Sequence, residues 1–417
     1  MNFELTDRKR GVICHIHSLK SMASSKHADS DRLISLGADC TVLPEKLLLA
    51  HAQGKVLFVT GAGTSFGANL PDFRGLALKT YEVLDAATHA VLKTIPHDAS
   101  NRHAPNMSGL TPQQSAEVRR FIAGDYDVVL GMLERRMDGN SSQGSSVRQA
   151  VARLLRDSST GPTNLHRSLM RLADRGGTTT IVTTNFDLLL ESSIRPRVQS
   201  YALGAIPRPS LRSDFAGIFH IHGALDPGPG RLSDFIISDQ DFGEFYLRRR
   251  VIPDFIYDAA RLFHLVLVGY SANDAPMRYL LNAVAADGSR FEDVKERFTF
   301  VGGAHPPDAL AMEDWKARGI TPIPYSDADD HFALNRTLER WAQFSAHNGN
   351  RNRIDAHIKR IVRAERATAT EADRDLFDHL VRRGTQNERV RLAELSSRSG
   401  ADHGWLDAIS AIGREHS

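Results

Sequence analysis

The chain has 417 residues, of which 41% are hydrophobic and 24% charged, values typical of a globular protein long enough for two or three domains. Its formal net charge of +2 is too small to indicate a nucleic-acid or membrane surface. Cysteine occurs at Cys14 and Cys40, which excludes a disulfide framework and a cysteine-based zinc site in the body of the chain. No run approaches the ~20 apolar residues of a membrane helix, and the N-terminus lacks a signal-peptide pattern, so we expect a cytoplasmic protein.

Residues 1–42 are predicted as an N-terminal arm, polar over Met1–Ser30, and a helix is predicted over Leu43–Gln53. The apolar run Val56–Val59 then predicts a strand that is covered on both faces. We expect the main domain to extend over residues 43–345.

A glycine-rich loop follows this first strand. Gly61 and Gly63 allow a sharp turn and a close approach of the backbone, so that N–H groups of the loop can face a phosphate. An ordinary dinucleotide-binding fingerprint, G-x-G-x-x-G, needs a third glycine where this chain has Phe66. The loop therefore predicts a phosphate-bearing ligand, but not a standard hydride-transfer site.

A helical insertion is predicted over about residues 77–175, after the first strand and its loop. Polar breaks separate its helices from one another. The predicted helices are Thr80–Leu92, Thr111–Ala123, Val128–Met137 and Ser146–Leu155.

Strand-like apolar runs return after the insertion, and most of them end in a polar or glycine-containing loop. They are Thr179–Thr183, Gly217–Ile221, Leu265–Val268, Phe298–Val301 and Ile320–Ile323. Strands alternating with helices predict a Rossmann-like α/β fold, with a parallel sheet of about six strands and helices on both faces. The loops then meet at the carboxyl edge of the sheet, where such sheets bind ligands. Residues 346–417 are charge-rich and predicted as a helical C-terminal extension that serves as an interface.

Asn185 and Asp187 follow the second strand, in the sequence TTNFD. In one interpretation their amide and carboxylate face the ligand at the carboxyl edge of the sheet. In the other, Asn185 caps a helix over Phe186–Ser193, and the helix macrodipole favours Asp187 in its first turn. Both residue types are preferred at those positions, so the local sequence leaves the two compatible interpretations open.

His220 and His222 alternate in FHIHG, so on a strand they would share a face. The two histidines could bind a metal as a pair, but no third ligand stands at a suitable spacing, so metal binding is set aside. His222 is the better candidate for a base near neutral pH, because Gly223 follows it and opens space beside it. The alternative is a structural histidine, which for a histidine taken alone is the more common case.

Gly269 follows the strand Leu265–Val268 and again permits a close backbone approach. Ser271 can donate a hydrogen bond to a phosphate or a ribose. The alternative is a strand-to-helix turn with Asn273 or Asp274 as N-cap, which explains those two residues better than a ligand contact does.

These motifs, in this order, resemble the sirtuin family. GAGTS, followed five residues later by PDFRG, is similar to the sirtuin cofactor loop, with Thr64 in place of the usual isoleucine and Asn69 in place of glycine. TTNFD resembles the family's TQN-I-D, His222-Gly223 matches its catalytic histidine motif, and GYS stands where the family has GTS. The resemblance covers about Glu45 to Arg340 and implies that the ligand is NAD.

The resemblance also implies roles for individual residues. Asn185 would lie at the nicotinamide ribose and orient a water, and His222 would be the base at the ribose hydroxyls. Asp187 would recognise the nicotinamide carboxamide. The other implied cofactor-binding residues are Ala62, Gly63 and Ser271 at the phosphates, Phe73 over the nicotinamide pocket, Arg74 at the loop or the cofactor, Asp327 near the adenosine half, and Ser65 and Gly269.

The departures from the family pattern are also informative. Sirtuin deacylases usually carry a zinc module with four cysteines soon after the HG motif, and no cysteine follows Cys40 here, so no zinc is expected. The insertion, the GYSxND form and the helical tail resemble the zinc-less sirtuin-like effectors of bacterial antiphage defence, which destroy NAD.

We therefore expect an NAD glycohydrolase that acts as a toxic effector of abortive infection. It would form a homo-oligomer and act with a partner such as a DNA-translocase-type ATPase or a short Argonaute. One alternative is an NAD-dependent protein deacylase or ADP-ribosyltransferase. Another is a non-catalytic module that senses NAD or ADP-ribose.

Overall fold

The computed structural model describes residues 32–97, 105–139, 144–195, 197–225, 235–269, 281, 294–304 and 306–415. The chain divides into two compact units. One is Gly54–Ala342, and the other combines Met1–Gln53 with Gln343–Ser417. The predicted domain limits at residues 43 and 345 stay predictions, because compactness alone does not measure independent folding.

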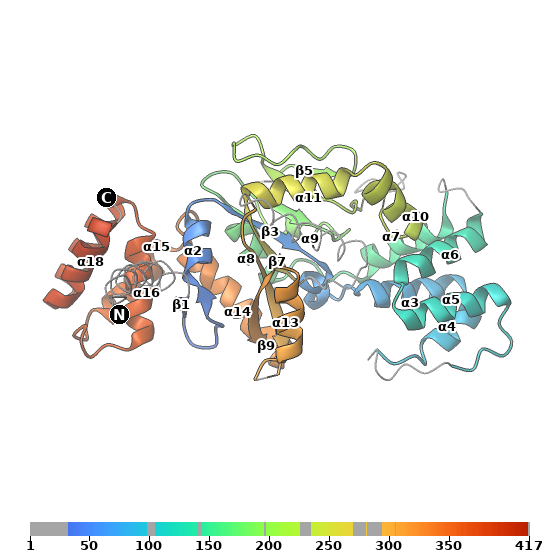
Figure 1. Cartoon of the computed structure of the whole chain (residues 1–417), viewed down its shortest axis with the longest axis horizontal. Helices are drawn as coiled ribbons and strands as arrows, with labels where there is room; N and C mark the ends of the chain where they lie inside the picture. Colours follow the sequence, from blue (N-terminus) through green and yellow to red (C-terminus); the bar gives the residue numbers. More distant parts are fainter. Residues whose placement is uncertain are drawn as a thin grey trace, which may run out of the picture. The chain divides into compact units, whose positions relative to one another are not determined.

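The larger unit is built on a seven-stranded sheet in which all neighbouring strands are parallel (Figure 1). The strand order is β5-β6-β4-β3-β7-β8-β9. The strands are β3 (Val56–Thr60), β4 (Thr180–Thr183), β5 (Ser200–Ala202), β6 (Gly217–His220), β7 (His264–Val268), β8 (Arg297–Gly303) and β9 (Thr321–Ser326). The order reverses at β3, because β4 to β6 lie on one side of it and β7 to β9 on the other. Open parallel sheets bind ligands at such a switch point, outside the carboxyl ends of the strands.

The predicted Rossmann-like α/β class is confirmed, and six of the seven strands coincide with predicted ones to within a few residues. The strand β5 is missing from the prediction. It has only three residues, lies at the edge of the sheet and is partly exposed. A segment this short, beginning with a serine, has no apolar run by which to recognise it.

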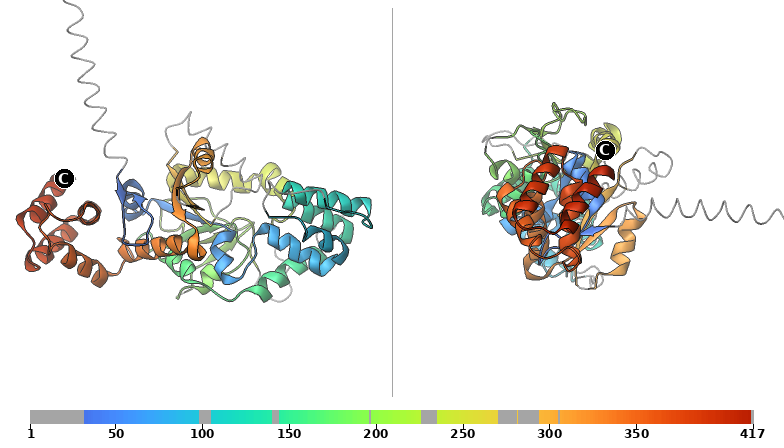
Figure 2. Two further views of the ribbon diagram at one scale, coloured as in Figure 1. Left: turned by 90° about the horizontal axis from the view of Figure 1, so that it is seen from below. Right: turned by 90° about the vertical axis from the view of Figure 1, so that its left-hand side faces the viewer.

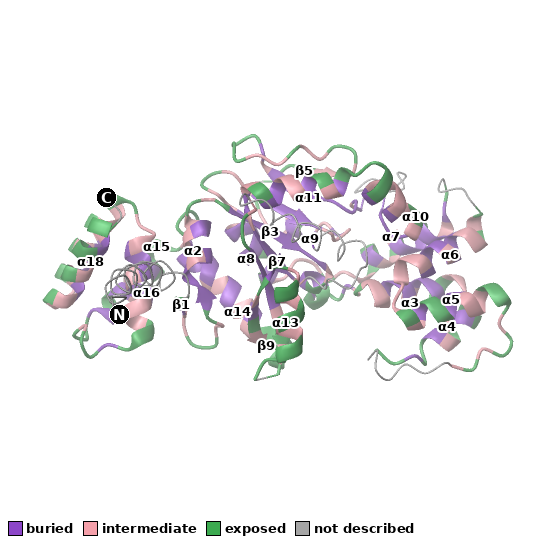
Figure 3. Ribbon diagram, in the orientation of Figure 1, coloured by how far each residue is buried: buried purple, intermediate pink, exposed green. Residues whose placement is uncertain are grey.

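Helices cover both faces of the sheet, and Figure 3 shows its central strands as buried. Leu57 of β3 packs in one core with Ile256 of α11. Phe58 points to the opposite face, because successive side chains of a strand alternate, and its ring lies 5.4 Å from that of Trp341 on α14. The helices of this unit outside the insertion are α8 (Asn164–Leu172), α9 (Leu189–Ser192), α10 (Asp239–Phe242), the π-helix η3 (Gly243–Arg248), α11 (Val251–Leu262), α13 (Ala309–Ala317) and α14 (Ala328–Phe344).

The helical insertion lies between β3 and β4, and Figure 2 shows its helices as one bundle in blue to teal. They are α3 (Phe73–Leu84), α4 (Ala86–Leu92), α5 (Pro112–Ala123), α6 (Tyr126–Asp138) and α7 (Ser146–Ser158). Buried side chains such as Tyr81, Phe121 and Leu130 form its core. The predicted helix Thr80–Leu92 is interrupted at Asp85, whose carboxylate accepts the N–H of Thr88 and begins a new helix.

The smaller unit contains the helical C-terminal extension that the sequence predicts. Its elements are β1 (Leu33–Ile34), β2 (Leu43–Pro44), α2 (Glu45–Ala52), α15 (Arg351–Ile361), α16 (Glu371–Arg382), α17 (Gln386–Arg398) and α18 (His403–Glu415). The buried carboxylate of Glu45 accepts a hydrogen bond from Arg382 at 2.6 Å and lies 3.2 Å from the ring of His379. Burial alone would raise the pKa of Glu45, but the hydrogen bonds and charges of these two partners outweigh it and lower that pKa.

Candidate functional site

The glycine loop at the carboxyl end of β3 forms a short 3-10 helix, η1 (Ala62–Ala68). The N–H of Gly61 donates to the carbonyl of Val268 at 3.0 Å, and that of Gly63 to the carbonyl of Gly269 at 2.8 Å. A Cβ on Gly63 would lie 2.9 Å from the Cα of Gly269, so only glycine permits this approach. The loop is thereby joined to the end of β7, at the switch point of the sheet. Ala62 is half-buried and Gly63 exposed, which leaves this part of the loop open to a ligand.

The departure from the family pattern at Asn69 keeps the backbone of the loop. Asn69 ends η1 in the left-handed conformation, with φ 63°. Glycine enters this region most readily, and asparagine is one of the few other residues that tolerate it. The exchange therefore preserves the turn that leads to α3.

Asn185 lies against this loop from the end of β4. Its Nδ2 donates to Oγ1 of Thr64 at 3.2 Å and to Oγ of Ser65 at 3.1 Å. Its backbone N–H donates to Oγ1 of Thr183 at 3.0 Å. The interpretation of Asn185 as a helix cap is wrong, because α9 begins only at Leu189. The side chain instead joins two loops from neighbouring strands.

Asp187 is buried and completes the same cluster. Its Oδ2 accepts a hydrogen bond from Oγ of Ser65 at 2.9 Å, and its Oδ1 accepts the N–H of Leu189 at 3.0 Å. Burial raises the pKa of Asp187, and the two hydrogen bonds only partly oppose that shift. Ser65 is therefore the residue through which Asn185 and Asp187 are connected.

His166 of α8 also reaches Ser65, and the sequence analysis missed it. Its Nε2 lies 3.4 Å from Oγ of Ser65, while its Nδ1 accepts the N–H of Thr163 at 3.2 Å. Because Nδ1 accepts, the ring proton is on Nε2 and points to Ser65. Burial lowers the pKa of His166 to about 4, so the ring is neutral at pH 7. The spacing Thr-x-x-His was the available signal, since it forms a capping box at the start of α8.

His220 braces the backbone of Asn185 from the end of β6. Its Nδ1 lies 2.9 Å from the carbonyl oxygen of Asn185, and its Nε2 lies 2.8 Å from Oε1 of Glu191. Both partners are acceptors, so the fully buried ring donates from both nitrogens. Burial would lower the pKa of His220, but the hydrogen bond and charge of Glu191 outweigh it and raise that pKa.

His222 lies beyond the end of β6, so the two histidines do not share a strand face. The hydrogen bond that its side chain makes leads to Tyr246 of η3, with Nε2 and Oη 2.6 Å apart. Burial lowers the pKa of His222 to about 3. Gly223 follows with φ +94°, a conformation that favours glycine, and turns the chain away.

Phe73 and Arg74 begin α3 and face the helical insertion. The ring of Phe73 is edge-on to that of Tyr126, with centroids 6.4 Å apart. Arg74 donates to the carbonyl of Ile95 at 2.6 Å, and its guanidinium lies 5.2 Å from the ring centroid of Phe121. In this structure Arg74 therefore ties the start of α3 to the rest of the helical insertion.

Of the remaining predicted residues, the structure describes Asp327, which lies apart from this cluster. Asp327 follows β9, three strands away from β3, and its N–H bonds to the carbonyl of Gly303 at 3.4 Å. Burial and the carboxylate of Asp327 raise the pKa of Tyr325 to about 12. Ser271, with the alternative caps Asn273 and Asp274, lies outside the described residues.

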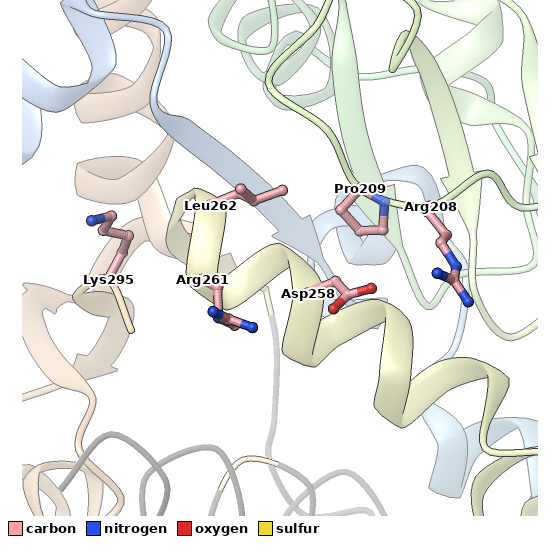
Figure 4. A pocket seen from close by; sticks show the side chains of 6 residues that line it. All are labelled: Arg208, Pro209, Asp258, Arg261, Leu262 and Lys295. Atoms are coloured by element: carbon pink, nitrogen blue, oxygen red, sulfur yellow. The ribbon is translucent and has the colours of Figure 1, made fainter. Parts of the chain in front are cut away.

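A shallow depression of about 400 Å³ lies on another part of the larger unit (Figure 4). Its lining combines three cations with one carboxylate and shares no residue with the predicted site. The lining residues are Arg208, Pro209, Asp258, Arg261, Leu262 and Lys295.

Two features are absent from the part of the chain that the structure describes. No group of three or more His, Cys, Asp or Glu side chains is arranged to hold a metal ion. No helix is both long and apolar enough to cross a membrane.

Comparison with known proteins gives two findings. The family described as SIR2-like domain matches residues 179–323, which include Asn185, Asp187 and His222. The uncharacterized protein y4cA of Sinorhizobium fredii is 34% identical over 302 residues, 70% of this chain. The aligned part is 22% of that relative, so the chain spans about a fifth of its length. The SIR2-like match covers about a third of the chain and is consistent with an NAD-using enzyme.

Proposed function

We propose that the chain is an NAD glycohydrolase. The bond between the nicotinamide nitrogen and the ribose carbon breaks, water supplies a hydroxyl to that carbon, and the products are nicotinamide, ADP-ribose and a proton. The observation that carries the proposal is the cluster in which Ser65 links Asn185 and Asp187, at 3.1 Å and 2.9 Å. It gathers an amide, a hydroxyl and a carboxyl group beside a glycine loop at the switch point of the sheet.

The amide of Asn185 is suited to orienting the attacking water. Breaking an N-glycosidic bond develops an oxocarbenium-like ribose, which depends on positioning and a preorganised polar pocket more than on a strong nucleophile. Two hydroxyls hold Nδ2 of Asn185, so the amide has one orientation. We assign its Oδ1 to the water.

Asp187 is suited to binding the nicotinamide carboxamide. Each of its oxygens accepts one hydrogen bond within the protein, and each keeps a second lone pair for a carboxamide N–H. The backbone N–H of Ala62 is assigned to the phosphates, and Gly63, whose own N–H donates to Gly269, lets the loop come close to them. His222 is assigned to the ribose hydroxyls as their base. Hydrolysis rather than deacylation is favoured because no cysteine follows His222 to build a zinc module.

We further propose that the hydrolase is an effector of antiphage defence. The resemblance of its insertion and helical tail to zinc-less sirtuin-like effectors supports this. In that setting NAD loss stops the infected cell, and a homo-oligomer or a partner ATPase or Argonaute controls the activity.

The test is nicotinamide release from NAD, followed by chromatography, with no acylated peptide present. We expect release by the chain, alone or mixed with the protein encoded beside it, and a fall of at least about a hundredfold in Asn185→Ala. Asn164→Ala is the matched control, because Asn164 is an asparagine that accepts from Arg167 on the exposed side of α8.

Two other outcomes would replace the proposal. NAD consumption that requires an acyl-lysine or another acceptor protein would indicate a deacylase or an ADP-ribosyltransferase. NAD that binds and stays intact, even in the assembled complex, would indicate a sensor.

A further inference from the structure

The ring of His222 is covered by the segment that runs from α10 through η3. The ring of Phe242, at the end of α10, is edge-on to His222 with centroids 5.7 Å apart. The ring of Tyr246 on η3 lies at 5.9 Å. Both side chains belong to the buried core of the sheet, so the imidazole is closed off on this side.

The hydroxyl of Tyr246 is hydrogen-bonded to Nε2 of His222, the nitrogen that would accept a proton if His222 acts as a base. A separation of 2.6 Å is normal for an O–H donor and short for an N–H donor, so Tyr246 donates and Nε2 of His222 accepts. A neutral imidazole has one acceptor nitrogen. A ribose hydroxyl that gives its proton to His222 needs the same position. The contact with Tyr246 and the contact with substrate therefore exclude each other.

The segment that carries Tyr246 has an irregular backbone. It is a π-helix, a form that is rare and frequent at functional sites. Arg250 follows it in the left-handed conformation, with φ 53°, although it is not a glycine. Leu247, next to Tyr246, is 79% exposed. A strained segment of this kind can release its strain by rearranging.

Ion pairs from the helical insertion fix the position of α10, which continues into η3. Arg135 of α6 pairs with Asp239 at 2.9 Å. Arg148 of α7 pairs with Asp241 at 2.8 Å and donates to the carbonyl of Phe235 at 2.7 Å. Gly131 lets α6 approach, since a Cβ there would lie 2.1 Å from Oδ1 of Asp239.

We propose that Tyr246 blocks His222 in the resting chain, and that the helical insertion, through its ion pairs with α10, determines when the block is released. A ligand or partner that moves α6 and α7 would withdraw Tyr246 and uncover the base. The inference rests on the proposed function in one respect, the role of His222.

The direct test is Tyr246→Phe, which removes the hydroxyl and keeps the ring. We expect kcat/KM for NAD to rise about five- to tenfold, the factor that one lost hydrogen bond produces. Tyr257→Phe on α11 is the matched control and should leave the rate unchanged. An unchanged or lower rate in Tyr246→Phe would overturn the inference.

The role of the ion pairs between the insertion and α10 is tested by Arg135→Ala, with Arg120→Ala as the control. Both arginines pair with an aspartate in or beside the insertion, but Arg120 pairs with Asp125, away from α10. We expect Arg135→Ala to raise the rate about two- to threefold and Arg120→Ala to leave it unchanged. Equal rates in the two variants would remove the insertion from the inference.

A binding measurement separates this inference from the proposed function. If neither the chain nor Tyr246→Phe cleaves NAD, alone or mixed with the protein encoded beside it, hydrolysis fails as the function. Calorimetry of NAD binding in the Asn185→Ala background then decides about the block. Affinity at least about fivefold tighter with Tyr246→Phe added would support the block, and smaller gains or none would refute it.

Discussion

The two halves of the candidate site are held in different ways. Ser65 joins Asn185 and Asp187 across two loops of the central sheet, and His166 and His220 brace these residues from α8 and β6. His222 is bonded to Tyr246, on a segment whose place depends on ion pairs with the helical insertion. The difference teaches that the half assigned to water and carboxamide is preorganised, whereas the half assigned to the base is adjustable.

Removing the link in the preorganised half should have the largest effect. Ser65→Ala leaves Asp187 with one donor fewer and Asn185 with one acceptor fewer, so we expect nicotinamide release to fall at least about a hundredfold. Ser193→Ala is the control, because its hydroxyl bonds to the carbonyl of Leu190 on α9. Rates within about twofold of the parent chain would show that the link is dispensable.

A substitution at the contact between the loops of β3 and β7 should have the next largest effect. A Cβ at Gly269, where φ is +59°, would lie 2.3 Å from the backbone nitrogen of Thr64. We expect Gly269→Ala to lower the free energy of unfolding of the larger unit by about 3 kcal/mol in urea titrations. A Cβ at Gly303 would have no atom within 4 Å, so we expect Gly303→Ala to lower the free energy of unfolding by less than about 1 kcal/mol. Equal losses would mean that the contact is not tight.

Lowering the pH should change the stability contributions of the two halves in opposite directions, through His222 in one half and His220 in the other. His222 has a depressed pKa, near 3 in the folded chain against 6.5, so below pH 6.5 the unfolded chain binds the extra proton and stability falls. The raised pKa of His220 acts in the opposite sense, since its stabilisation is present below pH 6.5 and is lost at higher pH.

We therefore expect the free energy of unfolding to fall between pH 7 and pH 5 by about 2 kcal/mol less in His222→Gln than in the parent chain, measured by urea unfolding. His97→Gln, at a side chain that is 77% exposed, should follow the parent chain. A difference of the opposite sign would show that His222 is charged when folded.

The bracing of Ser65 by His166 should give the smallest effect. His166→Phe removes the N–H that points to Ser65, and we expect kcat to fall about fivefold with little change in KM. His166→Gln keeps a donor and should restore part of the rate. A change confined to KM would assign His166 to substrate binding instead.

The parts of the site that the sequence reveals are those that directly follow an apolar run. The glycine loop, Asn185 and Asp187 each stand at the end of a buried strand, and parallel strands bring such ends together. His166 and Tyr246 come from helices, where a buried polar side chain interrupts no pattern. The helix-cap interpretation of Asn185 failed because Asp187, rather than Asn185, accepts the first N–H of α9.

The strand order also constrains how the chain reaches its native state. Val56 of β3 pairs with His264 of β7, roughly two hundred residues later, whereas the insertion is held by contacts between neighbouring helices. During synthesis the bundle of α3 to α7 can therefore fold first, while one flank of β3 stays open until β7 has been made. The hydrogen bonds of Gly61 and Gly63 to the end of β7 can form only at that moment, so a chain interrupted before residue 264 lacks this side of the site.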